Sequence, residues 1–541
     1  MKKFFTLCFW LFSFTFAENI LSNGDMEYGD GGWYIWNNPN GPAEYSGSAA
    51  IEKVGFNKSR GVKITVKKKP ADWWGLQIQA PKFLADTCFY ELKFKAKGDG
   101  SINAAVQGGA PDYRQKMMSS FVLTKEWKTY SMKFYADEKG YGLNNVVFQV
   151  GFFTGNVYLD DVEITPIENV YDYSWYASAE ARIDSIRKKE FTLSGFKSGE
   201  VVEVELLRHE FPFGTALALY DSDDSVETWY RKMANKYFWY GVPENQFKWP
   251  EYEPEKGKLQ KKQLNEYFEF AEKNGWNLRA HTLVWGIQKY NYDKHFGNLG
   301  TCAEISENIK KRIERDLKEY KGKFQEYDVW NEPLHETFLF DKCGIQLLDS
   351  AFVWAHRTDP EAVLYINDYN VVSSGETERY YALIESLLKR KIPVHGIGVQ
   401  CHFNGMAVEP ALIKERLDRL SELKLPIKVT EFDLGANFTE EEQAIATEKF
   451  IRTVFSHKNV SGIVFWGFYD GRHWLPGSGI LDIKGREKQA AKVVYDLWHK
   501  TWTTKEKLKA TPSGKIHFKG FPGKYLLKTA SGIKTVELKS R

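Results

Sequence analysis

Two hydrophobic patterns divide the chain. Between residues 19 and 166, apolar and polar positions alternate in short runs between Gly, Asp and Asn turns, and no helical period of comparable length competes. The clearest runs are 61–66, 89–96, 127–135, 145–153 and 156–164. Alternation of this kind is typical of half-buried antiparallel strands, so the pattern predicts an antiparallel β-sandwich.

From residue 211 onward, apolar strand-like runs alternate with amphipathic helices. In the predicted helix 304–320, apolar residues recur four positions apart at Ile305, Ile309, Ile313 and Leu317. The strand-like runs are 211–216, 237–242, 278–283, 326–330, 362–366, 396–399, 427–430 and 462–465. Eight strands with intervening helices over about 290 residues predict a (β/α)8 TIM barrel.

The remaining segments flank these two domains. Lys2 and Lys3, the apolar run 4–16 and the small residue Ala17 predict a secretory signal peptide. We therefore expect a secreted protein, extracellular or held at the cell surface or in the periplasm. The predicted division is a signal peptide (1–17), a β-sandwich (18–166), a connector with short strands (167–208), the barrel (209–503) and a short β-rich C-terminal extension (504–541). The extension is expected to pack against the strands at 190–207, because neither would be stable alone.

Charge and cysteine content narrow the classes of partner. Lys plus Arg number 74 and Asp plus Glu 71, a net charge of +3 without a long run of one sign. This balance points to neither nucleic acid nor a membrane as partner. Loss of the leader leaves four cysteines; Cys302 and Cys343 are the expected disulfide, and Cys401 is expected to be a buried free thiol.

Candidate chemistry lies at the ends of two predicted barrel strands. The run 326–330 leads to Asn331 and Glu332, and the run 427–430 leads to Glu431 and Asp433. TIM barrels place their chemistry at the C-terminal strand ends. Two carboxylic acids brought together there are the minimum equipment for splitting a glycosidic bond.

The strand ends carry seven motifs in chain order. They read PENQFKW at 243–249, RAHTLVW at 279–285, DVWNE at 328–332, INDYN at 366–370, VQCH at 399–402, VTEFD at 429–433 and VFWG at 464–467. Together they resemble the glycoside hydrolase family 10 endo-1,4-β-xylanases over the whole barrel. Two departures are Gly286, where many members carry a histidine, and Trp330, where a smaller apolar residue is usual.

The resemblance implies a role for each matching residue. Glu332 is similar to the family's general acid/base and Glu431 to its nucleophile, in a retaining double displacement with the carboxyl groups about 5 to 5.5 Å apart. His402 and Asp433 resemble the residues that keep the nucleophile ionised, and Asn331 and Gln400 those that bind the sugar hydroxyl beside the reacting carbon. The implied cleft is completed by Glu244, Asn245, Lys248, His281, Trp285, Gln288, Trp466 and Trp474. No metal or other cofactor is expected, since no closed ligand set at a familiar spacing occurs.

The two ends of the sandwich, 19–27 and 157–164, resemble those of carbohydrate-binding modules found beside plant-wall hydrolases. The expected partners are xylan and xylo-oligosaccharides in the barrel, and insoluble plant cell-wall polysaccharide on the sandwich. The chain has 18 Trp, 29 Tyr and 37 Phe, and flat aromatic faces suit sugar rings. Candidate platforms on the sandwich are Trp33, Trp36, Trp73, Trp74 and Tyr113.

Two alternatives to a xylanase stay open at this point. One is a retaining glycanase that acts on β-glucan or a mixed chain, because the chemistry at the reacting carbon is shared and only the cleft walls discriminate. The other is a polysaccharide-binding protein on a catalytically dead barrel. The presence of both Glu332 and Glu431 argues against this last possibility.

Overall fold

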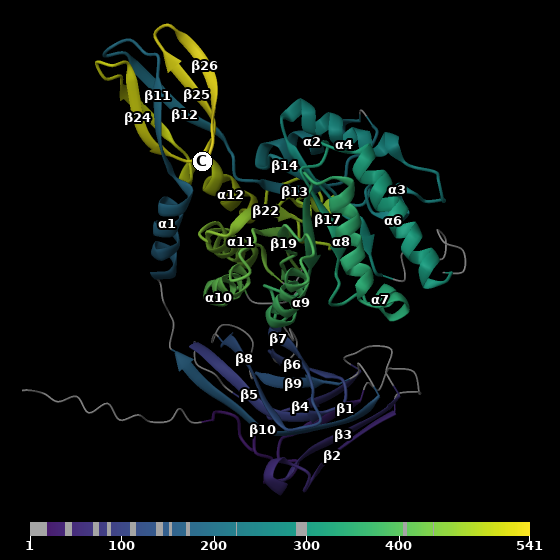
Figure 1. The fold of residues 1–541 in the computed structure, drawn as a ribbon. Helices are drawn as coiled ribbons and strands as arrows, with labels where there is room; N and C mark the ends of the chain where they lie inside the picture. The colour runs from purple at the N-terminus through teal and green to yellow at the C-terminus, as the bar shows by residue number, and fades with distance from the viewer. Residues whose placement is uncertain are drawn as a thin grey trace, which may run out of the picture. The chain divides into compact units, whose positions relative to one another are not determined.

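The computed structural model describes residues 19–540 except 38–45, 69–74, 84–87, 109–114, 137–143, 151–153, 169–173, 223, 288–299, 404–407 and 436–437 (Figure 1). The predicted leader, Gln288, Trp73, Trp74 and Tyr113 lie outside the described residues. The chain divides into two compact units, Met1–Tyr171 and Asp172–Arg541.

The first unit contains two five-stranded antiparallel sheets, as the alternating pattern predicts. The first sheet has the order β1 (Tyr34–Asn37), β4 (Leu76–Gln79), β9 (Asn145–Gln149), β6 (Ser101–Gln107), β7 (Gln115–Val122). The second has the order β2 (Ser46–Glu52), β3 (Gly61–Lys68), β10 (Gly155–Glu168), β5 (Cys88–Gly98), β8 (Lys128–Ala136). Ile64, Leu92 and Phe148 are among the residues that share one hydrophobic core.

Trp33 belongs to that core, which corrects its assignment as a sugar platform. Its side chain is only 8% exposed, its ring stacks on Phe148, and its Nε1 donates a hydrogen bond to the Asn23 carbonyl. A tryptophan with its hydrogen bond satisfied inside a sandwich is a packing residue. Trp36, on β1, is partly exposed.

Eight parallel strands close a barrel within the described part of the second unit, which confirms the predicted fold class. In chain order they are β13 (Phe213–Leu217), β14 (Tyr240–Pro243), β15 (Asn277–Ala280), β17 (Glu326–Asn331), β18 (Val363–Asp368), β19 (Gly396–Val399), β21 (Ile427–Leu434) and β22 (Val460–Phe465). Pairing of β15 with β17 completes the ring. Two short strands, β16 (Val284–Trp285) and β20 (His402–Phe403), pair with β17 and β21 at their C-terminal ends.

Helices follow the barrel strands and bury their apolar stripes against them. They are α2 (Ser225–Tyr237), α3 (Trp249–Tyr252), α4 (Lys261–Asn274), α6 (Cys302–Glu319), α7 (Phe338–Cys343), α8 (Gln346–Thr358), α9 (Thr377–Lys389), α10 (Pro410–Ser421), α11 (Glu440–Phe455) and α12 (Gln489–Asp496). The four predicted apolar residues of α6 are buried, and Thr301 with Glu304 forms a capping box at its start. No helix among the described residues is long and apolar enough to cross a membrane.

Both cysteine predictions of the barrel unit are confirmed. Cys302 and Cys343 form a disulfide with their Cα atoms 5.2 Å apart, which ties the start of α6 to the end of α7. Cys401 is a buried free cysteine, and burial raises the pKa of its thiol.

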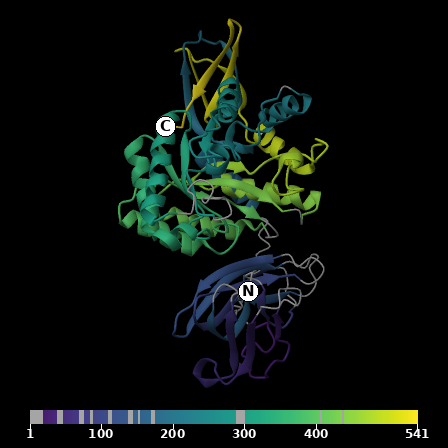
Figure 2. The ribbon, with the colours of Figure 1, turned by 90° about the vertical axis from the view of Figure 1, so that its right-hand side faces the viewer.

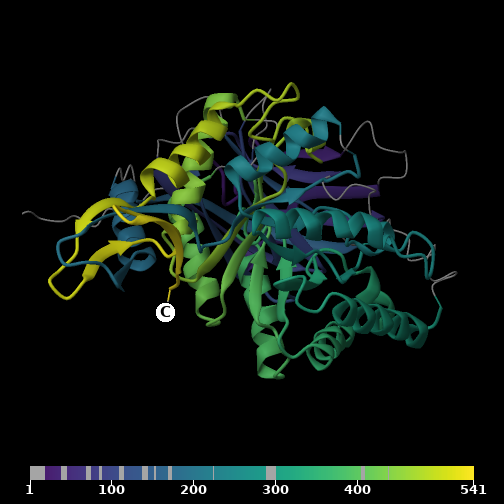
Figure 3. The same ribbon diagram turned by 90° about the horizontal axis from the view of Figure 1, so that it is seen from above.

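A small β-structure joins the connector to the C-terminal extension, also as predicted. β11 (Lys189–Ser194), which follows helix α1 (Ser174–Arg187), pairs with β24 (Lys515–Gly520). β12 (Val201–His209) lies between β23 (Lys505–Lys509) and β25 (Gly523–Thr529), with β26 (Gly532–Leu538) beyond β25. The yellow C-terminal strands lie beside the blue connector strands in all three views (Figures 1, 2 and 3).

Candidate active site

The two predicted catalytic glutamates come from β17 and β21, at the C-terminal side of the barrel. Glu332 directly follows β17, where its backbone takes a left-handed conformation (φ 59°) and its N–H donates to the Asn367 carbonyl at 2.7 Å. Glu431 is the fifth residue of β21. Their side chains are almost fully enclosed, with Glu332 8% and Glu431 4% exposed.

Glu332 sits in surroundings that favour its protonated form. Trp285 Nε1 donates to one carboxyl oxygen at 2.7 Å, and Gln400 Nε2 donates to the other at 2.9 Å. Burial raises the pKa of Glu332 to about 7; the negative charges of Asp368 and Glu431 add to this effect, and the two hydrogen bonds oppose it. Glu332 therefore keeps its proton to a higher pH than an ordinary glutamate does.

Glu431 has the opposite preference. Asn367 Nδ2 donates to its Oε1 at 2.7 Å, His402 Nε2 lies 3.5 Å from its Oε2, and His281 Nδ1 lies 3.9 Å from its Oε1. Burial raises the pKa of Glu431, but His281, His402 and Lys248 outweigh burial, so that the net shift is downward. Glu431 is therefore ionised where Glu332 is protonated.

His402 connects Glu431 to a buried carboxylate and an indole. Its Nδ1 lies 2.8 Å from Asp433 Oδ1, and Trp474 Nε1 donates to Asp433 Oδ2 at 2.8 Å. Burial lowers the pKa of His402, but Asp433 and Glu431 raise it to a net value of about 10. An imidazolium held in this way donates from both ring nitrogens, one toward each carboxylate.

A second histidine, His281, is held by a buried aspartate that is itself paired with an arginine. His281 Nδ1 lies 3.0 Å from Asp328 Oδ2, and Asp328 also accepts from the Arg279 guanidinium. All three side chains are buried. These hydrogen bonds fix the imidazole ring on the Glu431 side of the site.

Asn367 is the central residue that the sequence reasoning did not single out. Its Nδ2 donates to Asn331 Oδ1 at 2.8 Å and to Glu431 Oε1 at 2.7 Å, while its Oδ1 accepts from Thr430 at 2.7 Å. Gln400 Nε2 reaches Asn331 Oδ1 at 3.4 Å from the other side. In the sequence, Asn367 is marked only by its position at the end of a barrel strand beside Asp368. Many asparagines with a purely structural role occupy such positions.

Glu244, Asn245 and Lys248 form one side of the cleft. Lys248 Nζ donates to Asn245 Oδ1 at 2.9 Å and lies 5.2 Å from the Trp285 ring and 5.5 Å from the Trp466 ring. Burial lowers the pKa of Lys248 and raises that of Glu244. The amine therefore lies among aromatic faces and carboxylates.

The two tryptophans of the last strand end differ in exposure. Trp466 is 5% exposed, with its ring centroid 4.9 Å from that of His281. Trp474 is 52% exposed and bonds Asp433 only through its indole edge. The structure thus brings together every predicted site residue except Gln288, which lies outside the described residues.

The two family departures have local structural reasons. A Cβ on Gly286 would stand 2.3 Å from the Glu336 carbonyl oxygen, so this backbone approach requires glycine. Trp330 is fully buried and stacks on Phe340 with centroids 4.9 Å apart. Neither residue displaces a site side chain.

Comparison with known proteins gives two family matches. Residues 204–497 match the model of glycosyl hydrolase family 10, and residues 18–151 match that of a carbohydrate binding domain.

Curated relatives include three proteins of different length. The chain is 32% identical over 281 residues to a β-1,4-xylanase of Dictyoglomus thermophilum, covering 48% of this chain and 78% of that protein. It is 31% identical over 371 residues to the anti-sigma-I factor RsgI6 of Acetivibrio thermocellus, covering 67% of this chain but 47% of that protein. For endo-1,4-β-xylanase 1 of Arabidopsis thaliana the identity is 30% over 375 residues, with 66% and 38% covered. The chain therefore spans less than half of the last two relatives.

Among solved structures, native xylanase 10B of Thermotoga maritima is similar with a TM-score of 0.49 and 26% identity. That similarity covers 54% of this chain and 95% of the other.

Proposed function

The chain belongs to glycosyl hydrolase family 10, and we propose that it is a secreted retaining endo-1,4-β-xylanase with Glu332 as acid/base and Glu431 as nucleophile. The single observation that carries the assignment is the pair of enclosed carboxyl groups in different surroundings. Trp285 and Gln400 donate to Glu332, whereas Asn367 donates to Glu431 and His402 lies 3.5 Å from it. These surroundings raise the pKa of Glu332 and lower that of Glu431. Environments that push two carboxyl pKa values apart separate the acid from the nucleophile.

In the first step Glu332 donates its proton to the glycosidic oxygen as that bond breaks, and Glu431 Oε bonds to the reacting carbon. In the second step Glu332, now ionised, takes a proton from water, and the water oxygen displaces Glu431. The raised pKa of Glu332 suits a group that must donate and then accept one proton. The product keeps the anomeric configuration of the substrate.

Neighbouring side chains orient these two groups. Asn367 and Gln400 both donate hydrogen bonds to the side-chain oxygen of Asn331. The Asn331 NH2 group is therefore directed toward the sugar hydroxyl beside the reacting carbon. That hydrogen bond strengthens as positive charge develops in the transition state. His402 and His281 hold the Glu431 carboxylate in place and keep it ionised.

Xylan is the substrate that fits the cleft walls best. Xylose lacks the hydroxymethyl group of glucose, and bulky Trp466 and Trp474 opposite Glu244 and Lys248 leave little room for that group. The carbohydrate-binding unit supports a role on insoluble plant cell-wall polysaccharide. The basic and apolar start of the chain supports export.

Product analysis on xylan and β-glucan, with the anomeric form of fresh product followed by NMR, tests the proposal. We expect xylo-oligosaccharides that first appear as the β anomer. An α-anomer product would overturn the two-step mechanism, and similar turnover of xylan and β-glucan would overturn the substrate assignment. Glu431→Ala should abolish hydrolysis and leave polymer binding intact; if wild type also yields no product, a binding protein is the better description.

A further inference from the structure

A cavity lies at the opposite end of the barrel from Glu332 and Glu431. It has a volume of about 520 Å³ and is lined by the starts of barrel strands, the end of α1 and the C-terminal extension. Pro426 lines it and precedes Glu431 by five residues, so the two are roughly 16 Å apart along β21. A volume of this size lies within the range of small-molecule sites.

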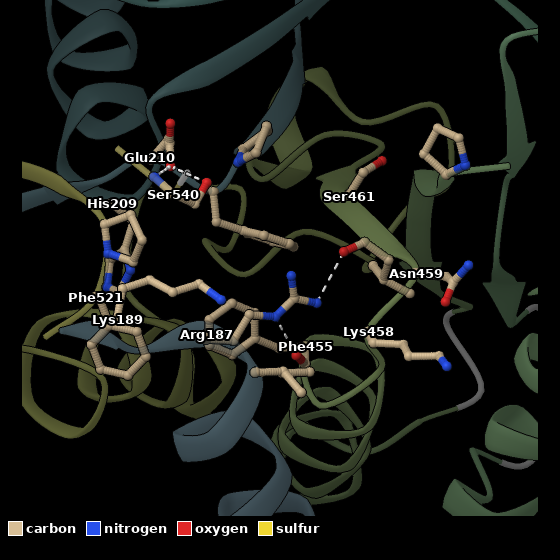
Figure 4. Close-up of a pocket in the computed structure, with 16 residues that line it drawn as sticks. Arg187, Lys189, His209, Glu210, Phe455, Lys458, Asn459, Ser461, Phe521 and Ser540 are labelled. Atoms are coloured by element: carbon tan, nitrogen blue, oxygen red, sulfur yellow. Dashed lines mark hydrogen bonds between the residues drawn. The ribbon is translucent and has the colours of Figure 1, made fainter. Parts of the chain in front are cut away.

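The polar part of this cavity is cationic. The charged side chains that line it are those of Arg187, Lys189, Lys458 and Glu210. The Glu210 carboxylate accepts hydrogen bonds from the Ser540 hydroxyl at 2.6 Å and from the Ser540 N–H at 2.8 Å. His209 adds no charge, because burial lowers its pKa to about 3. In Figure 4 the Lys189 side chain extends toward the Arg187 guanidinium.

Arg187 has a structural role that leaves part of its guanidinium unused. Nε donates to the Phe455 carbonyl at 2.8 Å, and Nη2 donates to the carbonyls of His457 at 2.7 Å and Val460 at 2.9 Å, which caps the end of α11. Burial lowers its pKa to about 10, and it therefore stays charged at neutral pH. Within the described residues no carboxylate pairs with it, and Nη1 is left facing the cavity (Figure 4).

Lys189 and Lys458 are likewise without an ion-pair partner among the described residues. Like charges that line one cavity without a counter-ion repel one another, and an anion that bridges them removes this repulsion. A bare inorganic anion would use only this part of the cavity. The apolar surface of the remaining walls comes from the half-buried Phe211 and from the prolines Pro212, Pro426 and Pro522, with Asn459 and Ser461 as polar neighbours.

We propose that this cavity binds a small organic acid made of one six-membered ring and a carboxylate, with the carboxylate between Lys189 and Arg187. The ring then lies on the apolar walls, as sugar and aromatic rings do on phenylalanine and proline surfaces. Two kinds of compound share this chemistry, a uronic acid and an aromatic acid. The site is separate from the catalytic carboxylates, so the proposal does not depend on the hydrolytic function.

Isothermal titration calorimetry of the full chain at low ionic strength tests the site with glucuronate, benzoate, glucose and inorganic phosphate. We expect saturable binding of glucuronate or benzoate, and whichever binds more tightly identifies the kind of acid. Glucose and phosphate should bind at least about tenfold more weakly, since each lacks either the charge or the ring. Lys189→Met should weaken the acid about tenfold, the effect of one lost charge-assisted hydrogen bond.

The matched control is Lys318→Met, an exposed lysine on α6 remote from the cavity, which should leave the affinity within about twofold. Lys458→Met, on an exposed turn, serves as the second cavity variant if Lys189→Met lowers the melting temperature. Hydrolysis of xylan should be unchanged in all three variants. No saturable binding of either acid, equal binding of glucose, or affinities indifferent to both cavity substitutions would overturn the proposal.

Discussion

At the scale of single residues, Glu332 and Glu431 differ through their neighbours rather than through their own chemistry. Glu332 is enclosed and lies near the negative charges of Asp368 and Glu431, whereas Glu431 is enclosed and faces His281, His402 and Lys248. Burial therefore raises the pKa of Glu332, whereas at Glu431 the neighbouring cationic groups outweigh burial and lower the pKa. This difference makes the pH profile a direct readout of the site.

We expect kcat/KM to fall as pH rises through about 7, because Glu332 then loses the proton that it must donate. The acidic limb should lie below the ordinary glutamate range, since the pKa of Glu431 is lowered. Asp368→Asn removes a negative charge beside Glu332 and should move the basic limb to lower pH. Asp349→Asn, which breaks only an exposed pair with Arg390, is the control. A basic limb that stays in place or rises in Asp368→Asn would contradict this electrostatic account.

Asn367 is predicted to be a positioning residue for the nucleophile. Asn367→Leu keeps the branched shape of the side chain but removes the Nδ2 group that donates to Glu431 and to Asn331. We expect kcat/KM to fall by about 10²-fold, the usual effect of losing one preorganised donor, and the acidic limb to move to higher pH. Asn274→Leu, which removes a hydrogen bond to the Phe270 carbonyl within α4, should leave both unchanged. A loss of activity with an unmoved acidic limb would assign Asn367 to folding alone.

The sequence identifies site residues that belong to a recognisable motif. It does not identify residues whose role depends on contacts with residues far away in the chain. Glu332, Gln400 and His402 could be named because each belongs to a strand-end motif that resembles the family and to which the family gives a role. Asn367 could not, because its two donor contacts join residues 36 and 64 positions away in the chain. The prediction that Trp33 is a sugar platform is wrong because a sandwich core also contains tryptophan, and the sequence does not show which indole is enclosed.

At the scale of elements, the segment after β22 that carries Trp474 is fixed by buried charges. Arg472 donates to the Ala218 carbonyl at 2.8 Å and to Glu227 at 2.6 Å. Its guanidinium also lies 4.4 Å from the centroids of the Tyr220 and Tyr230 rings. Lys488 pairs with Asp470 at 2.8 Å in the same segment. These ion pairs therefore hold in place the segment from which Trp474 bonds to Asp433.

Arg472→Met should loosen this segment and raise KM for xylan several-fold with a smaller change in kcat. The reason is that Trp474 is proposed to contact substrate, while Glu332 and Glu431 belong to other strands. The melting temperature should also fall, because Glu227 loses one of its two arginine partners in a buried site. Arg486→Met breaks only exposed pairs and is the control. A fall in kcat at constant KM would show that Arg472 acts on the catalytic pair instead.

The ends of the predicted strands differ from the observed ends where the apolar run continues into a neighbouring element or loop. The predicted strand 237–242 begins too early, because Tyr237 is the last residue of α2 and its buried ring continues the apolar run of the strand. The predicted strand 278–283 is shorter in the structure, since β15 ends at Ala280 and the site residue His281 follows it. The pairing of β11 with β24 could be anticipated because two short amphipathic strand groups flanked one domain.

At the scale of the whole molecule, the chain has two units with separate hydrophobic cores. The catalytic constellation is built entirely from the barrel unit, and the matched carbohydrate binding domain lies entirely in the first unit. Binding of a polymer by one unit raises the effective concentration of the same polymer at the other. This effect applies to an immobile polymer and not to a small oligosaccharide that diffuses freely.

A chain that lacks residues 19–171 should therefore keep its kcat/KM on soluble xylo-oligosaccharides and lose rate on insoluble xylan at low substrate loading. The difference should shrink as the loading rises, because a high bulk concentration replaces the local one. Affinity electrophoresis of the full and shortened chains in gels that contain xylan or cellulose identifies the polymer bound. Equal rates of the two chains on insoluble xylan at every loading would make the first unit a spacer. A matching loss on soluble oligosaccharides would show that the barrel needs the first unit for its own integrity.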